Sequence, residues 1–123
     1  MILLADDDPG VREALACVLE SRGYSVVAVA DGDEAIEMLT RSSFDLVISD
    51  VDMPGNKELR VVRIANCVAE KTPVIVFSGR LTPAIIRMAR ELGAVACIEK
   101  RVDVDALLMQ IDGVMAACPM ASV

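Results

Sequence analysis

The sequence predicts an α/β fold, in which a five-stranded parallel sheet is sandwiched between helices on its two faces. Short apolar runs alternate with segments of helical periodicity along the chain, which is the pattern of parallel strands joined by right-handed crossovers. The chain has 123 residues, enough to bury one core. No linker, repeat or low-complexity stretch interrupts the alternation, so we expect one domain.

Five apolar runs predict the strands. Unbroken apolar character is typical of parallel strands that are buried on both faces. The predicted strands are residues 2–5, 25–30, 46–49, 73–77 and 95–98.

Capping residues and glycines indicate where the helices begin and end. Asp8 and Thr82 each precede a proline, which is the order of an N-cap and the first helical residue. Gly23 and Gly93 are placed to end these two helices. The other predicted helices cover residues 34–39, a less regular segment near 59–64, and a last segment capped by Asp103 and running to about Val114.

The end of the chain differs in character from the rest. We assign residues 1–115 to the domain and residues 116–123 to a C-terminal tail. The tail contains Pro119, and we expect it to be partly frayed or to lead into an output domain.

The composition excludes several functions. Acidic residues outnumber basic ones by 19 to 12, and the net charge of −7 argues against binding to a nucleic-acid backbone. The absence of histidine excludes Ser-His-Asp triads, histidine-ligated zinc and a histidine phosphocarrier in this chain. We therefore expect no direct binding of nucleic acid by this domain.

Cysteine usage and hydropathy indicate the compartment. Cys17, Cys67, Cys97 and Cys118 form no C-x-x-C pair, so we expect each to be a small buried apolar residue in a reducing cytoplasm. No apolar run reaches the roughly 18 residues of a membrane span. The sequence therefore predicts a cytoplasmic protein without a membrane partner.

Acidic residues follow the first and third predicted strands. In an open α/β sheet the functional cleft lies outside the carboxyl ends of the strands, where the strand order reverses. If the order is the flavodoxin-like 2-1-3-4-5, these two strands are neighbours at that point, and Asp6, Asp7 and Asp50 converge. Because close carboxylates repel one another and offer only oxygen ligands, they suit Mg²⁺, with Mn²⁺ as a substitute.

The fourth and fifth strands add a hydroxyl and an ammonium group to this edge. Ser78 could hydrogen-bond to one phosphoryl oxygen, and Lys100 could neutralise another as a point charge. Asp50, at the centre, would be the nucleophile that becomes an acyl phosphate. A single aspartate at a strand end is usually a helix cap, but here four strand ends supply complementary groups.

This set of residues resembles the receiver domain of two-component response regulators, over residues 2 to about 115. The residues that carry the resemblance are Asp6, Asp7, Asp50, Met53, Pro54, Gly55, Ser78 and Lys100. The resemblance implies a Mg²⁺-dependent phosphoacceptor, not an enzyme with its own substrate. It also implies a phosphohistidine donor on a sensor histidine kinase or a phosphotransfer protein.

The resemblance also implies a role for each residue. Asp50 is the phosphorylated aspartate, and Asp7 and Asp50 bind the metal through their side chains. Asp6 binds it directly or through water, and Asp52 contributes its backbone carbonyl. Ser78 is the hydroxyl that follows the phosphoryl group, and Lys100 pairs with that group.

Two positions depart from the family pattern. Arg101 follows the lysine where the family usually has proline in a cis peptide bond. A cis bond before another residue costs about 2.5–4 kcal/mol, so a trans bond with a different aim of Lys100 is an alternative. Cys97 stands where the family usually has the aromatic residue that reports phosphorylation. We therefore expect the phosphorylation chemistry to be intact and the readout to differ.

The usual output surface of receivers is formed by the fourth helix, fifth strand and fifth helix. A homodimer or an output domain is the expected partner there. Charged residues that could form ion pairs across a dimer are Arg87, Arg90, Glu91, Asp103 and Asp105.

Two other functions are alternatives. A receiver-like module that docks without being phosphorylated is favoured by the missing proline and aromatic residue. A haloacid-dehalogenase-type phosphatase would use Asp50 and Asp52 as its nucleophile and acid. Such phosphatases carry that pair on the first strand and their metal carboxylates late in the chain, which is the reverse of the order here.

Overall fold

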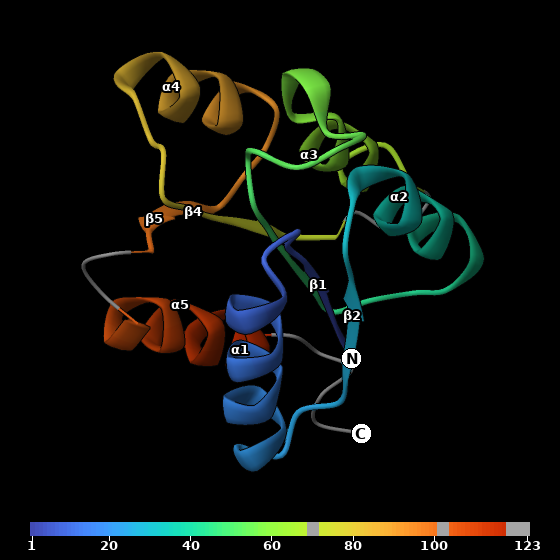
Figure 1. The fold of residues 1–123 in the computed structure, drawn as a ribbon, viewed down its shortest axis with the longest axis vertical. Coiled ribbons are helices and arrows are strands. Elements are labelled where there is room, and N and C mark those ends of the chain that lie inside the picture. Colours follow the sequence, from blue (N-terminus) through green and yellow to red (C-terminus); the bar gives the residue numbers. More distant parts are fainter. Residues whose placement is uncertain (69–71, 101–103, 118–123) are drawn as a thin grey trace.

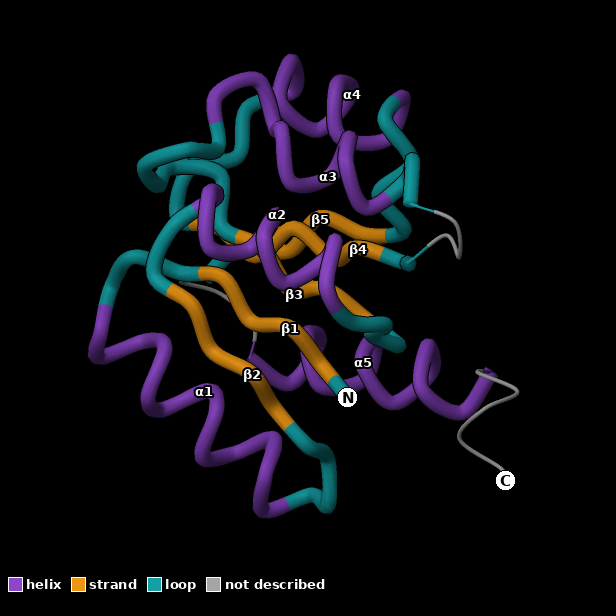
Figure 2. The backbone as a smooth tube through the Cα atoms, turned by 90° about the vertical axis from the view of Figure 1, so that its right-hand side faces the viewer, coloured by secondary structure: helices purple, strands orange, loops and turns teal. Residues whose placement is uncertain are grey.

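The chain folds around a parallel sheet with the strand order β2-β1-β3-β4-β5, in a computed structural model that describes residues 1–68, 72–100 and 104–117. Figure 2 shows the five strands side by side. Their bounds are β1 Ile2–Ala5, β2 Val26–Val29, β3 Leu46–Ser49, β4 Val74–Ser78 and β5 Ala96–Glu99. The predicted flavodoxin-like fold class and strand order are confirmed.

Helices cover both faces of the sheet (Figure 1). On one face lie α1 and α5, and on the other lie α2, α3 and α4. Their bounds are α1 Pro9–Ser21, α2 Gly32–Arg41, α3 Arg60–Ala65, α4 Pro83–Glu91 and α5 Val104–Ala117, with a 3₁₀ turn η1 at Lys57–Leu59. In the part of the chain that the structure describes, no helix has the length and apolar character needed to cross a membrane.

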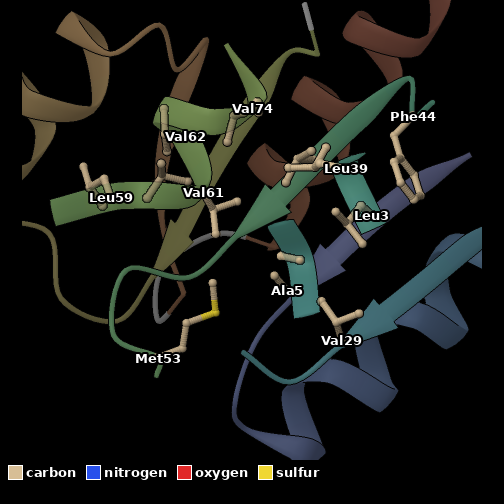
Figure 3. Close-up of a cluster of buried hydrophobic side chains, with 14 of the residues drawn as sticks. Leu3, Ala5, Val29, Leu39, Phe44, Met53, Leu59, Val61, Val62 and Val74 are labelled. Carbon is tan, nitrogen blue, oxygen red and sulfur yellow. The ribbon is translucent and has the colours of Figure 1, made fainter. Parts of the chain in front are cut away.

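The sheet separates two apolar layers. Successive residues of a strand point to opposite faces, so Leu3 and Ala5 pack toward α2 and α3, while Ile2 and Leu4 pack toward α1 and α5. Figure 3 shows the first layer, in which Leu3 lies near Leu39 and Phe44. All residues of β1, β3 and β4 are buried, which explains their unbroken apolar sequence.

Local capping confirms two predicted helix starts. The Asp8 carboxylate accepts hydrogen bonds from the backbone N–H groups of Gly10 and Val11, at 2.9 and 3.3 Å. The Thr82 hydroxyl accepts one from Ile85 N at 3.2 Å. At the other end of the chain, the predicted cap Asp103 and residues 118–123 of the predicted tail lie outside the described residues; α5 itself continues to Ala117.

The start of α3 departs from helical geometry. Glu58 and Leu59 have φ angles of +56° and +55°, in the left-handed region that side chains other than glycine rarely adopt. The helix therefore begins only at Arg60 and runs to Ala65, one residue later at each end than the predicted segment. The irregular apolar pattern of this segment reflects that break.

The prediction of buried cysteines is wrong at two positions. Cys17 and Cys67 are exposed, and Cys97 is half-buried. Cys17 lies on α1, whose buried residues are Leu15 and Leu19, so the cysteine faces away from the sheet. Cys118 lies outside the described residues.

Candidate functional site

Three carboxylates meet at the carboxyl ends of β1 and β3. The strands are paired so that Ala5 stands beside Ser49, and the residues that follow therefore lie side by side. Each of Asp6, Asp7 and Asp50 offers a carboxylate oxygen within 4.8 Å of the others. The structure thus brings together the three acidic residues that the strand order predicted.

Two of the three carboxylates are buried. Asp6 is 1% exposed and Asp50 is 6% exposed, whereas Asp7 is open to solvent. Asp6 Oδ1 accepts a hydrogen bond from Asp8 N at 3.0 Å, and Asp50 Oδ1 accepts one from Val51 N at 2.7 Å. Burial raises the pKa of the Asp6 carboxyl above its ordinary value, and the Lys100 ammonium opposes that rise.

Lys100 lies between the two buried acids. Its Nζ is 2.7 Å from Asp6 Oδ2 and 2.8 Å from Asp50 Oδ2. Burial lowers the pKa of Lys100, but its hydrogen bonds to Asp50 and Asp6 outweigh burial, and the net pKa is raised. The side chain therefore carries a positive charge at neutral pH. The sequence predicted Lys100 at this edge of the sheet as the partner of a phosphoryl group; the structure places its Nζ against both Asp50 and Asp6.

The donor set suits a small hard cation. One ammonium faces two buried carboxylates, so the cluster carries a net negative charge, which the exposed carboxylate of Asp7 increases. Mg²⁺ binds through a few carboxylates and keeps several waters, which an exposed ligand such as Asp7 permits. Asp6, Asp7 and Asp50 therefore fit Mg²⁺.

Ser78 and Asp52 occupy the side of the site next to β4. Ser78 is 1% exposed, and its Oγ accepts a hydrogen bond from Arg80 N at 3.1 Å. The Asp52 carboxylate is about half exposed and forms an ion pair with Arg80, with 3.2 Å between Oδ2 and Nε. The Asp52 side chain is thus directed to Arg80.

Asn56 and Arg80 are residues of this region that the sequence did not indicate. Asn56 is 3% exposed and holds the loop after β3, and Arg80 links the loops that follow β3 and β4. An asparagine after Pro-Gly is typical of an exposed turn, so nothing in the sequence indicated a buried residue here. Its burial and its hydrogen bond to the Asp50 carbonyl are visible only in the structure.

The two departures from the family pattern are only partly described by the structure. Arg101 and its peptide bond with Lys100 lie outside the described residues. Cys97 is half-buried on β5, and burial raises the pKa of its thiol. Among the residues of the predicted dimer surface, Asp103 lies outside the described part, and the exposed ones are Arg87, Arg90, Glu91 and Asp105.

Comparison with known proteins decides the family. The model of the family described as response regulator receiver domain matches residues 2–112. The chain belongs to this family. Receiver domains bind Mg²⁺ at an acidic pocket, and the cluster of Asp6, Asp7 and Asp50 lies where such a pocket is expected.

Relatives include both short and long proteins. Sporulation initiation phosphotransferase F of Bacillus subtilis (strain 168) is 30% identical over 104 residues, covering 85% of this chain and 84% of that protein. Transcriptional regulatory protein GlrR of Escherichia coli (strain K12) is 37% identical over 113 residues, covering 90% of this chain. This chain spans only 25% of the length of GlrR.

Solved structures agree with the fold. Chemotaxis protein CheY4 of Vibrio cholerae has a TM-score of 0.83 at 27% identity, covering 92% of this chain and 96% of that one. Full-length FixJ from B. japonicum has a TM-score of 0.84 at 28% identity, covering 98% of this chain and 60% of that one.

Proposed function

We propose that this receiver domain accepts a phosphoryl group on Asp50 from a phosphohistidine. A carboxylate oxygen of Asp50 forms the new bond to phosphorus, the N–P bond breaks, and the donor imidazole leaves with its electron pair. The observation that carries the proposal is the position of Asp50. The Asp50 side chain is buried, accepts a hydrogen bond from the Lys100 ammonium, and has a carboxylate oxygen within 4.8 Å of those of Asp6 and Asp7.

The other residues of the site stabilise the charge of the transferring group. Asp6, Asp7, Asp50 and the backbone carbonyl of Asp52 are the proposed ligands of Mg²⁺, which when bound neutralises charge on the phosphoryl oxygens. Lys100 lies 2.8 Å from Asp50 Oδ2 and would pair with one phosphoryl oxygen. The Ser78 hydroxyl, which accepts a hydrogen bond from Arg80 N, would donate one to a second phosphoryl oxygen.

The relatives indicate the kind of partner. The matching proteins include GlrR, named as a transcriptional regulatory protein, and the CAI-1 autoinducer sensor kinase/phosphatase CqsS of Vibrio cholerae. We therefore propose a sensor histidine kinase or a phosphotransfer protein as the donor, in the cytoplasm. We propose that the phosphorylated domain passes the signal to an output domain or to a second copy of the chain.

Intact-protein mass spectrometry tests the proposal. After incubation with acetyl phosphate and Mg²⁺, the wild-type chain should gain the mass of one phosphoryl group. EDTA should prevent the gain, and so should Asp50→Asn, because an amide cannot form the acyl phosphate. The matched control is Asp33→Asn, which removes an exposed carboxylate on α2 and should be phosphorylated like the wild type. A gain of mass in Asp50→Asn would contradict the assignment.

Docking without phosphorylation is a second candidate, because Cys97 replaces the aromatic residue of the usual readout. It predicts Mg²⁺ binding without a gain of mass from acetyl phosphate or from a phosphorylated kinase. The phosphatase alternative is not proposed, because the chain belongs to the receiver family.

A further inference from the structure

Asn56 connects the nucleophile to the start of α3 through one buried side chain. Its Nδ2 donates hydrogen bonds to the carbonyls of Asp50 at 2.8 Å and Val51 at 3.3 Å. Its Oδ1 accepts one from Val61 N at 2.9 Å. Every polar group of this side chain is therefore used, and all three bonds are lost if the amide is removed.

The carbonyls that Asn56 holds belong to the peptide groups that hold the Asp50 carboxylate. A peptide group is planar, so fixing its C=O also fixes its N–H. The Asp50 carbonyl shares a peptide group with Val51 N–H, which donates to Asp50 Oδ1 at 2.7 Å. The Val51 carbonyl shares the next group with Asp52 N–H, 3.4 Å from the same oxygen. Asn56 thus holds both peptide groups whose N–H groups face Asp50 Oδ1, and Ser49 Oγ also donates to the Asp50 carbonyl, at 3.0 Å.

The backbone on the far side of Asn56 is held in an unfavourable conformation. Glu58 and Leu59 both have positive φ, and such residues persist only where the surroundings hold them. Leu59 occupies the N-cap position of α3, and its side chain makes no capping hydrogen bond. The Val61 N–H instead donates to Asn56 Oδ1. Leu59 N donates to the Asn56 carbonyl at 3.2 Å. This turn brings the start of α3 within hydrogen-bonding distance of Asn56.

We propose that Asn56 is a positioning residue for the phosphoacceptor: it orients the peptide groups after Asp50 so that one carboxylate oxygen is fixed by backbone N–H groups and the other faces Lys100. This inference rests on the proposed function of Asp50. It predicts that the rate of phosphorylation and the affinity for Mg²⁺ depend on the Asn56 donor, beyond any effect on folding.

Asn56→Asp separates the two halves of the connection. The substitution keeps the size and the oxygen that accepts from Val61 N, but it replaces the donor to the Asp50 and Val51 carbonyls with an acceptor. Asn56→Ala removes both halves. The matched control is Val62→Ala, which weakens the packing of a fully buried residue of α3 and leaves the peptide groups after Asp50 untouched.

Two quantities are measured for each variant: the initial rate of phosphorylation by acetyl phosphate and the Mg²⁺ dissociation constant. The buffer and temperature are chosen so that circular dichroism shows every variant to be fully folded. Sucrose is added to all samples to favour the folded state. We expect both Asn56 variants to lose about tenfold or more in rate, and to bind Mg²⁺ more weakly, as residues that orient metal ligands do. Val62→Ala should match the wild type in both. The added charge of Asn56→Asp would by itself strengthen Mg²⁺ binding, so weaker binding reports lost orientation.

Wild-type rates and Mg²⁺ affinities in both Asn56 variants would overturn the inference, and so would equal losses in Val62→Ala. If the wild type gains no phosphoryl group, the proposed function fails, and the Mg²⁺ constants alone decide the role of Asn56. Weaker binding in the Asn56 variants only would then support it, and equal binding in all variants would overturn it.

Discussion

The central strands and the edge strands of the sheet contribute differently to the site. Every residue of β1, β3 and β4 is buried, whereas β2 and β5 are half-buried and each contains an exposed residue. Asp6, Asp50 and Ser78 come from the central strands and are themselves buried. Lys100 comes from the edge, after β5, and β4 separates it from β3.

This difference shows how a small domain can hold buried charges. The central strands fix the acids at a place where water is scarce and charge interactions are strong. The long side chain of Lys100, which follows the edge strand β5, reaches them, so the cation that pairs with both acids is supplied by a partly exposed edge of the sheet. The acids are fixed by the backbone, and the ammonium is placed by a flexible stem.

The largest expected effect compares equal truncations in the two kinds of strand. Ile75 on β4 is fully buried, and Ile98 on β5 is half-buried against the same apolar layer. Ile75→Ala should lower the free energy of unfolding by about 4 kcal/mol, and Ile98→Ala by about 1–2 kcal/mol, because the edge site leaves a smaller cavity. Urea unfolding at pH 7 measures both. Equal losses would show that the edge strand is as tightly packed as the centre.

Lys100→Ala tests the charge that crosses from the edge. It leaves Asp6 and Asp50 buried without their cation, which should cost about 2 kcal/mol of unfolding free energy, less than for a fully buried pair. Mg²⁺ should restore more stability to this variant than to the wild type, since it binds the folded state and replaces the lost charge. Urea midpoints with and without Mg²⁺ measure this.

Lys57→Ala is the matched control, because Lys57 is exposed on η1. Its urea midpoint should stay close to that of the wild type and respond to Mg²⁺ as the wild type does. If Mg²⁺ raises the urea midpoint of Lys100→Ala by no more than it raises that of the wild type, the interpretation of the cluster as a cation site is contradicted.

The turn before α3 offers a stabilising substitution. Glu58→Gly should raise the free energy of unfolding by up to about 1 kcal/mol, because glycine adopts positive φ without strain. Glu37→Gly, at an exposed position inside α2, should lower it by about 0.5–1 kcal/mol. Thermal unfolding of the two variants should therefore shift in opposite directions. A loss of stability in both would show that Glu58 is held without strain.

Much of the fold and part of the site could be predicted from the sequence. Buried central strands are unbroken apolar runs, and the caps Asp8 and Thr82 act within three residues, so both are visible in local sequence. The convergence of Asp6, Asp7 and Asp50 followed from strand order alone. The edge strands β2 and β5 are also short apolar runs, so their sequences resemble those of the central strands. They are partly exposed because each has a neighbouring strand on one side only.

The features that the sequence did not predict depend on contacts between distant segments. Asn56 became visible only because the loop folds back onto Asp50 and α3. The Lys100 contact with Asp6 depends on two segments that are far apart in the chain. The exposure of Cys17 and Cys67 depends on which helix face meets the sheet, and composition does not report this.

The smallest expected effect concerns the attachment of the edge strand β2. Tyr24, just before β2, donates a hydrogen bond to Asp112 of α5 at 2.7 Å. Burial and then this bond raise the pKa of Tyr24 above 10.0, while the Tyr24 bond and Arg22 lower the pKa of Asp112 below 3.8. The pair therefore adds stability between these values, and the gain is lost as the pH falls through the lowered pKa of Asp112 or rises through the raised pKa of Tyr24.

Tyr24→Phe should accordingly have a lower urea midpoint than the wild type at neutral pH. The difference should shrink toward zero at both ends of the pH range. Arg41→Ala, which removes an exposed ion pair within α2, serves as a control whose midpoint difference is small at every pH. A Tyr24→Phe difference that is constant with pH would exclude the hydrogen bond as its source.

The most direct test of the central claim is to locate the phosphoryl group on the chain. Reduction of an acyl phosphate with borohydride converts the modified aspartate into homoserine, which peptide mass spectrometry identifies by position. After treatment with acetyl phosphate and Mg²⁺, the account predicts homoserine at position 50 and nowhere else. Homoserine at the position of Asp6, Asp7 or Asp52, or none in a chain that has gained a phosphoryl group, would contradict it.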